Sequence, residues 1–376
     1  PHLSYDLLQM VSKDNHMLQV PLVNLVEHAN NIKAFGKGIA EFSGLKEYLN
    51  YITVQDSGTA TPEGYHDKNA VSLWTKGGRK MVDPQNYISH IEALQPDMFQ
   101  LLLDADTNTG SSAKRVKKSV DATVKFGKAC VEMKQKSEIL KDMPMLGCIA
   151  GGYNLKERLR CISEQKELDV AGYVIDGFHT NGETACDLIW PEVEPILIDT
   201  IAALPDSSPK FFHGAINPVN VLKFVTRGIK EQSLIEKTFC LNYLLCSKIN
   251  LVSESLPKLK EDSFLKAPSN GKEEKEEEDT TDYSYEISLK NKQYFADVAP
   301  LLEGCTCYSC RKYSRSYIHH LLNVGELQGP MLLMMHNLHH YLNFFTSIRA
   351  AIKEDKLEAL LTRIEDFVKE RKESAQ

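Results

Sequence analysis

The residues best suited to chemistry lie near the end of this 376-residue chain, where three cysteines precede a histidine in the pattern C-x-C-x2-C-x25-H. They are Cys305, Cys307, Cys310 and His336. Three thiolates and one imidazole are the donors of a tetrahedral structural zinc site. Four protein ligands leave no coordination position open for a catalytic water. We therefore expect one zinc ion that holds structure and does no chemistry.

Two questions about this site stay open at the level of sequence. Four nearby histidines compete for the fourth ligand position: His319, His320, His339 and His340. The other interpretation is that the three cysteines are ordinary buried thiols. The tight spacing favours a metal, because it packs three sulfurs onto one turn of chain.

The composition is that of a globular protein, with 42% hydrophobic and 25% charged residues. No apolar run is long enough to predict a transmembrane helix. Six further cysteines have irregular spacing in apolar surroundings, which suits free buried thiols in a reducing compartment. They are Cys130, Cys148, Cys161, Cys186, Cys240 and Cys246.

The charge is unevenly distributed. The formal net charge is -7, and residues 271–282 alone hold seven acids and two lysines. The rest of the chain is close to neutral, which argues against nucleic-acid binding over a broad basic face. A local basic patch remains open, and the acidic run predicts a solvated or disordered spacer.

Short apolar runs alternate with helical patterns through the first 230 residues. The strand candidates are 145–149, 172–175 and 211–215, and the helix candidates are 155–168, 188–204 and 219–228. This alternation predicts a parallel sheet, and its repeat length favours a TIM (β/α)8 barrel. An open doubly wound sheet is the alternative, but no G-x-G-x-x-G motif follows any strand.

We divide the chain into three parts. Residues 1–230 form the main part of the (β/α)8 barrel, 231–284 a divergent segment with the acidic loop, and 285–376 the zinc-binding subdomain. Helices are predicted over 313–322, 330–349 and 356–372. The expected fold is therefore α/β, a TIM barrel with an appended C-terminal zinc-binding helical subdomain.

Three motifs around the cysteines resemble a known family. They are C-T-C-Y-S-C at 305–310, R-S-Y-I-H-H-L at 315–321 and M-M-H-N-L at 334–338. The chain is similar here to the queuine/archaeosine tRNA-ribosyltransferases, the tRNA-guanine transglycosylases. Within that family it resembles most the eukaryotic non-catalytic accessory subunits, which pair with a separate catalytic subunit.

The resemblance extends over most of the chain. G-C-I-A-G-G at 147–152 lies where the family has G-x-x-Q-G-G, and G-Y-V-I-D-G-F at 172–178 where it has G-Y-A-I-G-G-L. Q-D-S-G at 55–58 resembles T-D-S-G-G-F. The resemblance implies a TIM barrel with a zinc module. It also implies a role in replacing guanine by queuine at the tRNA wobble position.

The catalytic strand of the family is not matched. Family enzymes hold an aspartate nucleophile in G-x-D-x-F-D, followed by P-T-R, and this aspartate attacks the ribose. The corresponding run here is G-I-K-E-Q-S, in which Lys230 replaces the first aspartate and Ser233 the nucleophile. We therefore expect no catalytic residue in this chain.

The resemblance also implies a vestigial base pocket. Ala150 stands where the family has a glutamine that reads the purine, and Asp176 replaces a small residue of the glycine-rich loop. Asp56 falls at the family's general acid/base and Asp104 at a pocket aspartate that binds the base. The alternative for both carboxylates is an ordinary loop cap at the end of a strand.

Three hypotheses for function follow. The first is a non-catalytic accessory subunit of a heteromeric queuine tRNA-ribosyltransferase, which supports base exchange by binding its partner and tRNA. The second is an active transglycosylase in which Asp56 or Asp104 is a displaced nucleophile. The third is a zinc-stabilised barrel with an unrelated ligand.

A partner surface is predicted after the cysteines. Tyr313, Tyr317 and His320 are spaced i, i+4 and i+7, so they would share one helix face. In the resembling family this helix lies at the subunit interface, and large aromatics are favoured interface anchors. The alternative is that this stripe packs on its own barrel.

The remaining expectations concern tRNA and location. Two small basic clusters could contact tRNA, or could be ordinary solvated helix faces: 114–118, and Lys369 with Arg371 and Lys372. We expect a heterodimer with a catalytic subunit, with a homodimer as the alternative when that partner is absent. The expected location is the cytoplasm. The resemblance adds peripheral association with the mitochondrial outer membrane.

Overall fold

The computed structural model describes residues 4–14, 16–182, 185, 188–213, 217–227, 251–253 and 286–375. The chain separates into two compact units. The larger contains Leu3–Gln9 and Lys13–Leu244, and the smaller contains Pro1–His2, Met10–Ser12 and Leu245–Gln376. The first helix, α1 (Tyr5–Val11), crosses this division.

The larger unit is built on a six-stranded sheet with the order β1-β2-β5-β6-β7-β8. Each neighbouring pair is parallel, so strand follows strand in chain order. The strands are β1 (Met17–Pro21), β2 (Leu49–Thr53), β5 (Met98–Gln100), β6 (Met145–Ile149), β7 (Gly172–Ile175) and β8 (Lys210–Phe212). All residues of β6 and β7 are buried, which explains their unbroken apolar sequences.

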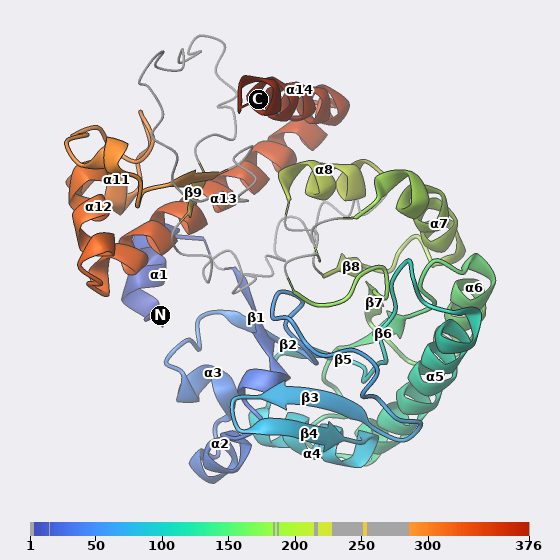
Figure 1. The fold of residues 1–376 in the computed structure, drawn as a ribbon. Coiled ribbons are helices and arrows are strands. Elements are labelled where there is room, and N and C mark those ends of the chain that lie inside the picture. Colours follow the sequence, from blue (N-terminus) through green and yellow to red (C-terminus); the bar gives the residue numbers. More distant parts are fainter. Residues whose placement is uncertain are drawn as a thin grey trace. The chain divides into compact units, whose positions relative to one another are not determined.

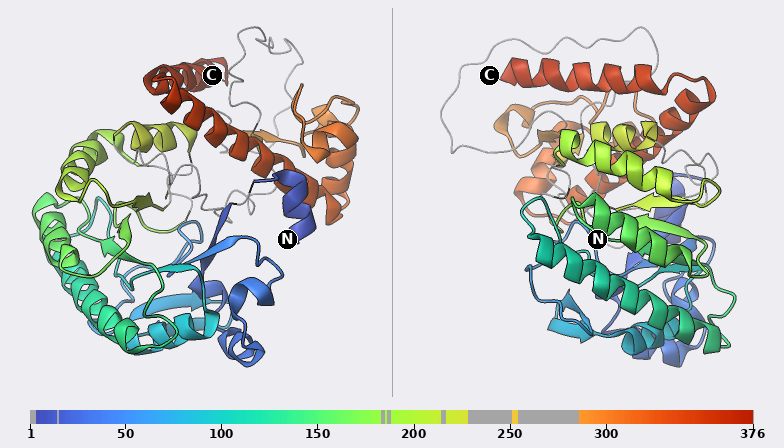
Figure 2. Two further views of the ribbon diagram at one scale, coloured as in Figure 1. Left: turned by 180° about the vertical axis from the view of Figure 1, so that it is seen from behind. Right: turned by 90° about the vertical axis from the view of Figure 1, so that its right-hand side faces the viewer.

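Helices connect these strands and lie on the outer side of the curled sheet (Figure 1). They are α2 (Ala29–Phe35), α3 (Gly38–Phe42), α4 (Pro84–Leu94), α5 (Ala113–Lys136), α6 (Leu155–Lys166), α7 (Trp190–Ala203) and α8 (Pro218–Thr226). A short 3-10 turn, η1 (Leu22–Asn24), follows β1. The view from behind shows the same sheet with α5, α6 and α7 on its outer side (Figure 2). The expected class is confirmed, as an α/β fold with a curled parallel sheet of the barrel type.

An antiparallel hairpin, which the sequence patterns did not predict, is inserted between β2 and α4. It consists of β3 (Val71–Thr75) and β4 (Gly78–Val82). The helix after it begins with Pro84, and Asp83 caps it by accepting a hydrogen bond from the backbone N–H of Asn86. The hairpin therefore belongs to the same end of the sheet as the loop that follows β2.

The smaller unit is mainly helical. Its elements are β9 (Leu251–Ser253), which pairs with β10 (Glu286–Ser288), then η3 (Lys292–Tyr294), α11 (Tyr308–Lys312), α12 (Arg315–Asn323), α13 (Gln328–Lys353) and α14 (Leu357–Ala375). Ile318, Leu321 and Leu333 are in its core. Helix α12 begins later than predicted, because the hydroxyl of Ser314 caps it by accepting from the N–H of Tyr317.

The boundaries that we predicted for the divergent segment stay a prediction. Lys230, Ser233 and the acidic run 271–282 lie outside the described residues, as does most of 231–284. Among the residues that the structure describes, no helix is both long and apolar enough to cross a membrane.

Candidate functional site

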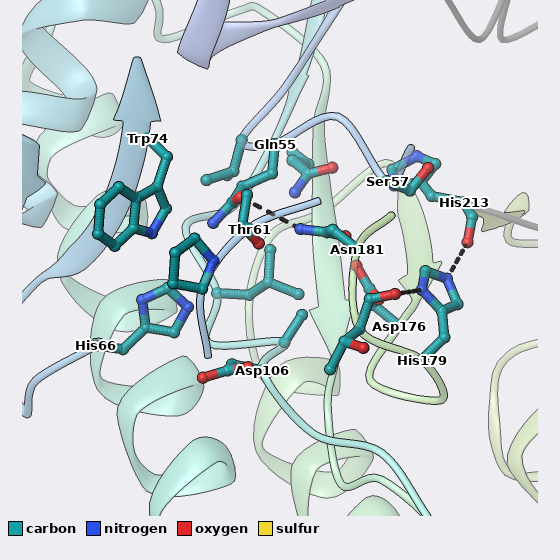
Figure 3. A pocket seen from close by; sticks show the side chains of 16 residues that line it. Gln55, Ser57, Thr61, His66, Trp74, Asp106, Asp176, His179, Asn181 and His213 are labelled. Carbon is teal, nitrogen blue, oxygen red and sulfur yellow. Dashed lines mark hydrogen bonds between the residues drawn. The ribbon is translucent and has the colours of Figure 1, made fainter. Parts of the chain in front are cut away.

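The loops after β2, β5, β7 and β8 meet around one pocket, at the carboxyl ends of the parallel strands. This is the end at which barrel enzymes hold their active sites. Gln55 and Ser57 come from the first loop, Asp106 from the second and Asp176 from the third, and His213 follows β8 (Figure 3). The hairpin adds Trp74. The structure therefore forms a pocket where the resemblance placed one.

Asp56 is buried, and its carboxylate is used within its own loop. One oxygen accepts a hydrogen bond from the N–H of Gly58 at 3.1 Å, and the other accepts from the hydroxyl of Thr59 at 2.9 Å. Gln55 and Ser57 line the pocket on either side of it, and Asp56 itself does not. This geometry is that of an Asx turn, which is a structural role for a loop carboxylate.

Asp104 is buried as well and is held by an arginine. Arg115, in the first turn of α5, donates to both carboxylate oxygens, at 2.8 and 2.5 Å. The same guanidinium lies 3.6 Å from Asp106, whose carboxylate also accepts from the N–H of Gly64 at 2.6 Å. A bidentate arginine is a strong, directional partner. Asp104 is therefore engaged, and Arg115 points inward to it.

The other two predicted pocket residues lie in different places. Asp176 lines the pocket, and one of its oxygens accepts from the N–H of Gly177 at 2.7 Å. Ala150 is fully buried in a small cluster with Val120 and Cys161, and it is not among the residues that line the pocket. Sequence reasoning placed these four residues in one pocket, and the structure puts only Asp176 on its wall.

A buried arginine beneath the glycine loop was missed. Arg158 in α6 donates to the carbonyl oxygens of Gly152, at 2.7 Å, and of Asp176, at 3.0 Å, and its guanidinium lies 3.9 Å from the ring centre of Phe178. Burial lowers its pKa to about 10. The sequence gives one signal of this close packing, which is the glycine at position 151. A side chain would have no room there, because Gly151 has a positive φ and lies in close contact with the α6 backbone.

Two of the histidines around the pocket have lowered pKa values. Burial lowers the pKa of His213 to about 4, and its ring lies 3.3 Å from the hydroxyl of Tyr51. Burial also lowers the pKa of His66, whose Nδ1 accepts from the N–H of Ser72 at 2.9 Å. Nε2 of His179 lies 2.8 Å from the carbonyl oxygen of His213. The lowered pKa values favour neutral rings for His213 and His66 at pH 7.

The space left between the described residues is small. The cavity volume is about 40 Å³. A cavity measured in this way needs about 10–15 Å³ to hold one water, so this enclosed space holds a few waters. Asn181 helps to close it, since its amide donates to the side chain of Gln55 at 3.2 Å.

The smaller unit brings together the four predicted metal ligands. The donor atoms of Cys305, Cys307, Cys310 and His336 all lie within 4.8 Å of one another. Nδ1 of His336 faces the three sulfurs at 3.8, 3.4 and 3.2 Å, in the order of the cysteines. His336 is fully buried, and its Nε2 has no hydrogen-bond partner among the described residues. The donor set fits zinc.

Local structure explains why the cysteines converge. Cys307 is the N-cap of α11, and its sulfur accepts from the N–H of Cys310 at 3.3 Å. The hydroxyl of Ser309 donates to the carbonyl oxygen of Leu332 at 2.7 Å, which fixes the cysteine turn to α13. His336 lies one turn further along α13. Two short-range contacts thus align three thiols with one imidazole.

The three thiols shift one another's pKa values. Hydrogen bonds from Cys307 and Cys310 lower the pKa of Cys305. The contact with Cys305 raises the pKa of Cys307 to about 11, and contacts with Cys305 and Cys307 raise that of Cys310. The protein atoms alone therefore favour one thiolate. A divalent cation would let all three thiols ionise, as zinc coordination requires.

The competing histidines have other partners. Nδ1 of His319 lies 2.7 Å from the carbonyl oxygen of Leu289, and Nδ1 of His339 lies 2.8 Å from that of Val11. His340 stacks on His336, with ring centres 6.0 Å apart. His320 is exposed. The geometry therefore selects His336 as the fourth ligand.

Two of the predicted partner residues form an aromatic pair beside this site, with one ring partly buried and the other exposed. Tyr313 lies just before α12, in extended backbone, so it does not share the helix face that we expected. Its ring nevertheless stacks on Tyr317, with centres 5.4 Å apart and planes at 14°. Tyr317 and His320 are exposed, and Tyr313 is partly buried. Tyr313 packs against the core of the smaller unit, and Tyr317 and His320 remain exposed.

The sequence can now be compared with known proteins. A sequence model described as TGT, queuine tRNA-ribosyltransferase, matches residues 1–370. Relatives named queuine tRNA-ribosyltransferase accessory subunit 2 include one from Ixodes scapularis, 36% identical over 93% of this chain and 85% of its own length. The one from Xenopus laevis is 37% identical over 96% of this chain and 88% of its own length. From this match over nearly its whole length, the chain belongs to the queuine tRNA-ribosyltransferase family.

Proposed function

We propose that this chain is a non-catalytic accessory subunit of a heteromeric queuine tRNA-ribosyltransferase. It supports the exchange of guanine for queuine at the tRNA wobble position by binding a catalytic subunit and tRNA. The relatives at 36–37% identity carry the name of such a subunit, and they match 93–96% of this chain.

One observation carries the proposal: neither of the two loop carboxylates that the resemblance places in the pocket is free. Asp56 is held in its own turn and Asp104 by Arg115, so neither points a free carboxylate at a ribose. Covalent exchange needs a nucleophile aligned with the anomeric carbon. This favours a supporting role over the displaced-nucleophile alternative.

Zinc is proposed as the resident metal, one ion per chain. Cys305, Cys307, Cys310 and His336 would hold it, and it would supply a crosslink between the cysteine turn and α13. The aromatic pair Tyr313 and Tyr317, with His320, is proposed as part of the surface that binds the catalytic subunit. Its exposure and rigid stacking suit an interface anchor.

The proposed location is the cytoplasm, with peripheral association at the mitochondrial outer membrane. Cys130, Cys148 and Cys161 are buried free thiols, which suits a reducing compartment. Extraction of a tagged chain from mitochondria with alkaline carbonate tests peripheral binding. A chain that resists extraction would contradict it.

Base exchange in three mixtures tests the function. Release of labelled guanine from tRNA would be measured with this chain alone, with the catalytic subunit alone, and with both. We expect no release from this chain alone and a large increase when the two are combined. Exchange by this chain alone, or no effect on its partner, would refute the proposal.

A further inference from the structure

His339, on α13, contacts two parts of the smaller unit that are far apart in the sequence, and it is not one of the proposed metal ligands. Its Nδ1 lies 2.8 Å from the carbonyl oxygen of Val11, and its Nε2 lies 3.4 Å from the hydroxyl oxygen of Thr306. A carbonyl oxygen only accepts hydrogen bonds, so Nδ1 carries the proton and donates to Val11. In a neutral imidazole Nε2 is then an acceptor, and the hydroxyl of Thr306 donates to it.

Thr306 stands between two of the proposed ligands, Cys305 and Cys307. Residues three apart on a helix are neighbours on one face, as His336 and His339 are on α13. Nδ1 of His336 faces the sulfur of Cys307 at 3.4 Å, and His339 faces the hydroxyl that lies one residue before it. The two histidines therefore contact the same cysteine turn, one through its sulfurs and the other through Thr306.

The other contact of His339 is with the end of helix α1. Val11 is the last residue of α1, where a carbonyl oxygen has no partner within the helix, so the Nδ1–H of His339 caps it. Val11 is buried, and Met10–Ser12 belongs to the same compact unit as α13. The helix has only 7 residues. Helices shorter than about 12 residues are marginal on their own, so α1 depends on contacts of this kind.

We propose that His339 is a positioning residue that couples metal binding at the cysteine turn to the docking of α1. The inference rests on the zinc ion proposed above. Zinc fixes Cys305 and Cys307, and Thr306 is then fixed between them. The hydroxyl of Thr306 holds the ring of His339 with its Nδ1–H directed at Val11. Such a coupling is reciprocal, so docking of α1 also strengthens the binding of zinc.

The first test is amide hydrogen exchange of α1 in the zinc-loaded full chain. His339→Leu removes the cap, so the amides of α1 should exchange about 2- to 10-fold faster while zinc stays bound. His339→Asn keeps an N–H donor near the position of Nδ1 and should restore the slower exchange. Asn343→Leu changes an exposed residue one turn further along α13 and is the matched control, with no expected effect.

The second test is zinc affinity, measured by competition with a chromogenic chelator. Thr306→Val and His339→Leu should each weaken binding about 10-fold. The double variant should bind no more weakly than His339→Leu alone, because both changes break the same contact. Thr306→Ser keeps the hydroxyl and should keep the affinity. Thr306 is exposed, so its variants test the coupling even where His339→Leu does not fold.

Two outcomes would overturn the coupling: unchanged exchange of α1 in zinc-loaded His339→Leu, or additive losses of zinc affinity in the double variant. Either result with normal zinc content in the unchanged chain would refute the coupling alone and leave the proposed metal intact. A folded, unchanged chain that binds no zinc would refute both.

Discussion

Asp104 and Asp56 are carboxylates whose hydrogen-bond partners decide what they can do. Arg115 holds the first through two hydrogen bonds, and backbone and hydroxyl donors of its own turn hold the second. Both stand at positions where the resembling enzymes have pocket acids. In this chain they stabilise loops, and that structural role requires no substrate.

Asp56→Asn should therefore leave base exchange by the assembled complex unchanged, within about two-fold. General acid/base catalysis is typically worth about 10²- to 10⁴-fold, so a catalytic Asp56 would give a much larger effect. Exchange rate and co-elution would be measured together. A loss of rate of a hundred-fold with assembly intact would show that this chain takes part in chemistry.

His213 makes a prediction about pH. Burial lowers its pKa from an ordinary value near 6.5 to about 4. Between these values the unfolded chain binds a proton that the folded chain does not, so stability is full above pH 6.5 and falls as pH drops towards 4. The loss should reach about 3 kcal/mol.

The measurement is the urea midpoint of the full chain from pH 7 to pH 4. His213→Phe should show a flatter pH dependence than the unchanged chain, whatever its absolute stability. His28→Gln, at an exposed histidine, is the matched control and should keep the original slope. Equal slopes in all three chains would show that His213 is protonated freely in the folded state.

At the level of single residues, the sequence predicted part of the candidate site. The metal ligands could be predicted because their spacing along the chain nearly fixes their chemistry. The inward turn of Arg115 and the burial of Arg158 could not, because a long side chain reaches its partner only once β5, β6 and β7 are in place. The prediction that Ala150 lines the pocket was wrong for a similar reason, since sequence similarity does not determine the direction of a side chain.

The cysteine turn and α13 together supply the ligand atoms of the proposed metal site. Cys307→Ser should remove the metal and unfold the smaller unit, because metal binding is part of its folding free energy. Zinc content would be measured by elemental analysis and structure by circular dichroism. Cys130→Ser changes a buried thiol in the larger unit and should retain one zinc. A folded chain without metal would contradict this account.

The aromatic pair before α12 makes a prediction about assembly. Tyr313→Ala with Tyr317→Ala should weaken binding of the catalytic subunit by about 2 kcal/mol or more, with the zinc retained. Phe35→Ala with Phe42→Ala removes another exposed aromatic pair, 5.6 Å apart on α2 and α3, and should have no effect. Affinity would be measured by calorimetry. Equal affinities of the two variants would place the interface elsewhere.

Elements buried on both faces were the easiest to predict. The strands β6 and β7 and the helices after them lie within a few residues of their predicted ranges, because their apolar runs are continuous. The hairpin β3–β4 was missed, because its second strand, G-R-K-M-V, is largely exposed and has little apolar patterning. The start of α12 was misjudged by two residues, because a serine cap overrode the aromatic spacing.

At the scale of the whole molecule, a barrel-type sheet and a candidate metal site occur in one chain. The barrel-type sheet gathers its loops at one end, and Asn181 and Gln55 contact each other across the pocket there. The zinc unit carries the exposed tyrosines. These features suit the accessory role proposed above.

The most direct test of this account is base exchange by a complex whose catalytic subunit has lost its own nucleophile. Incorporation of labelled guanine into tRNA would be measured, and covalent adducts sought on a denaturing gel. The account predicts an intact complex with no exchange and no adduct on this chain, because Asp56 and Asp104 are both held by protein donors and neither is free to attack a ribose. Exchange above background, or an adduct at the mass of this chain, would contradict it.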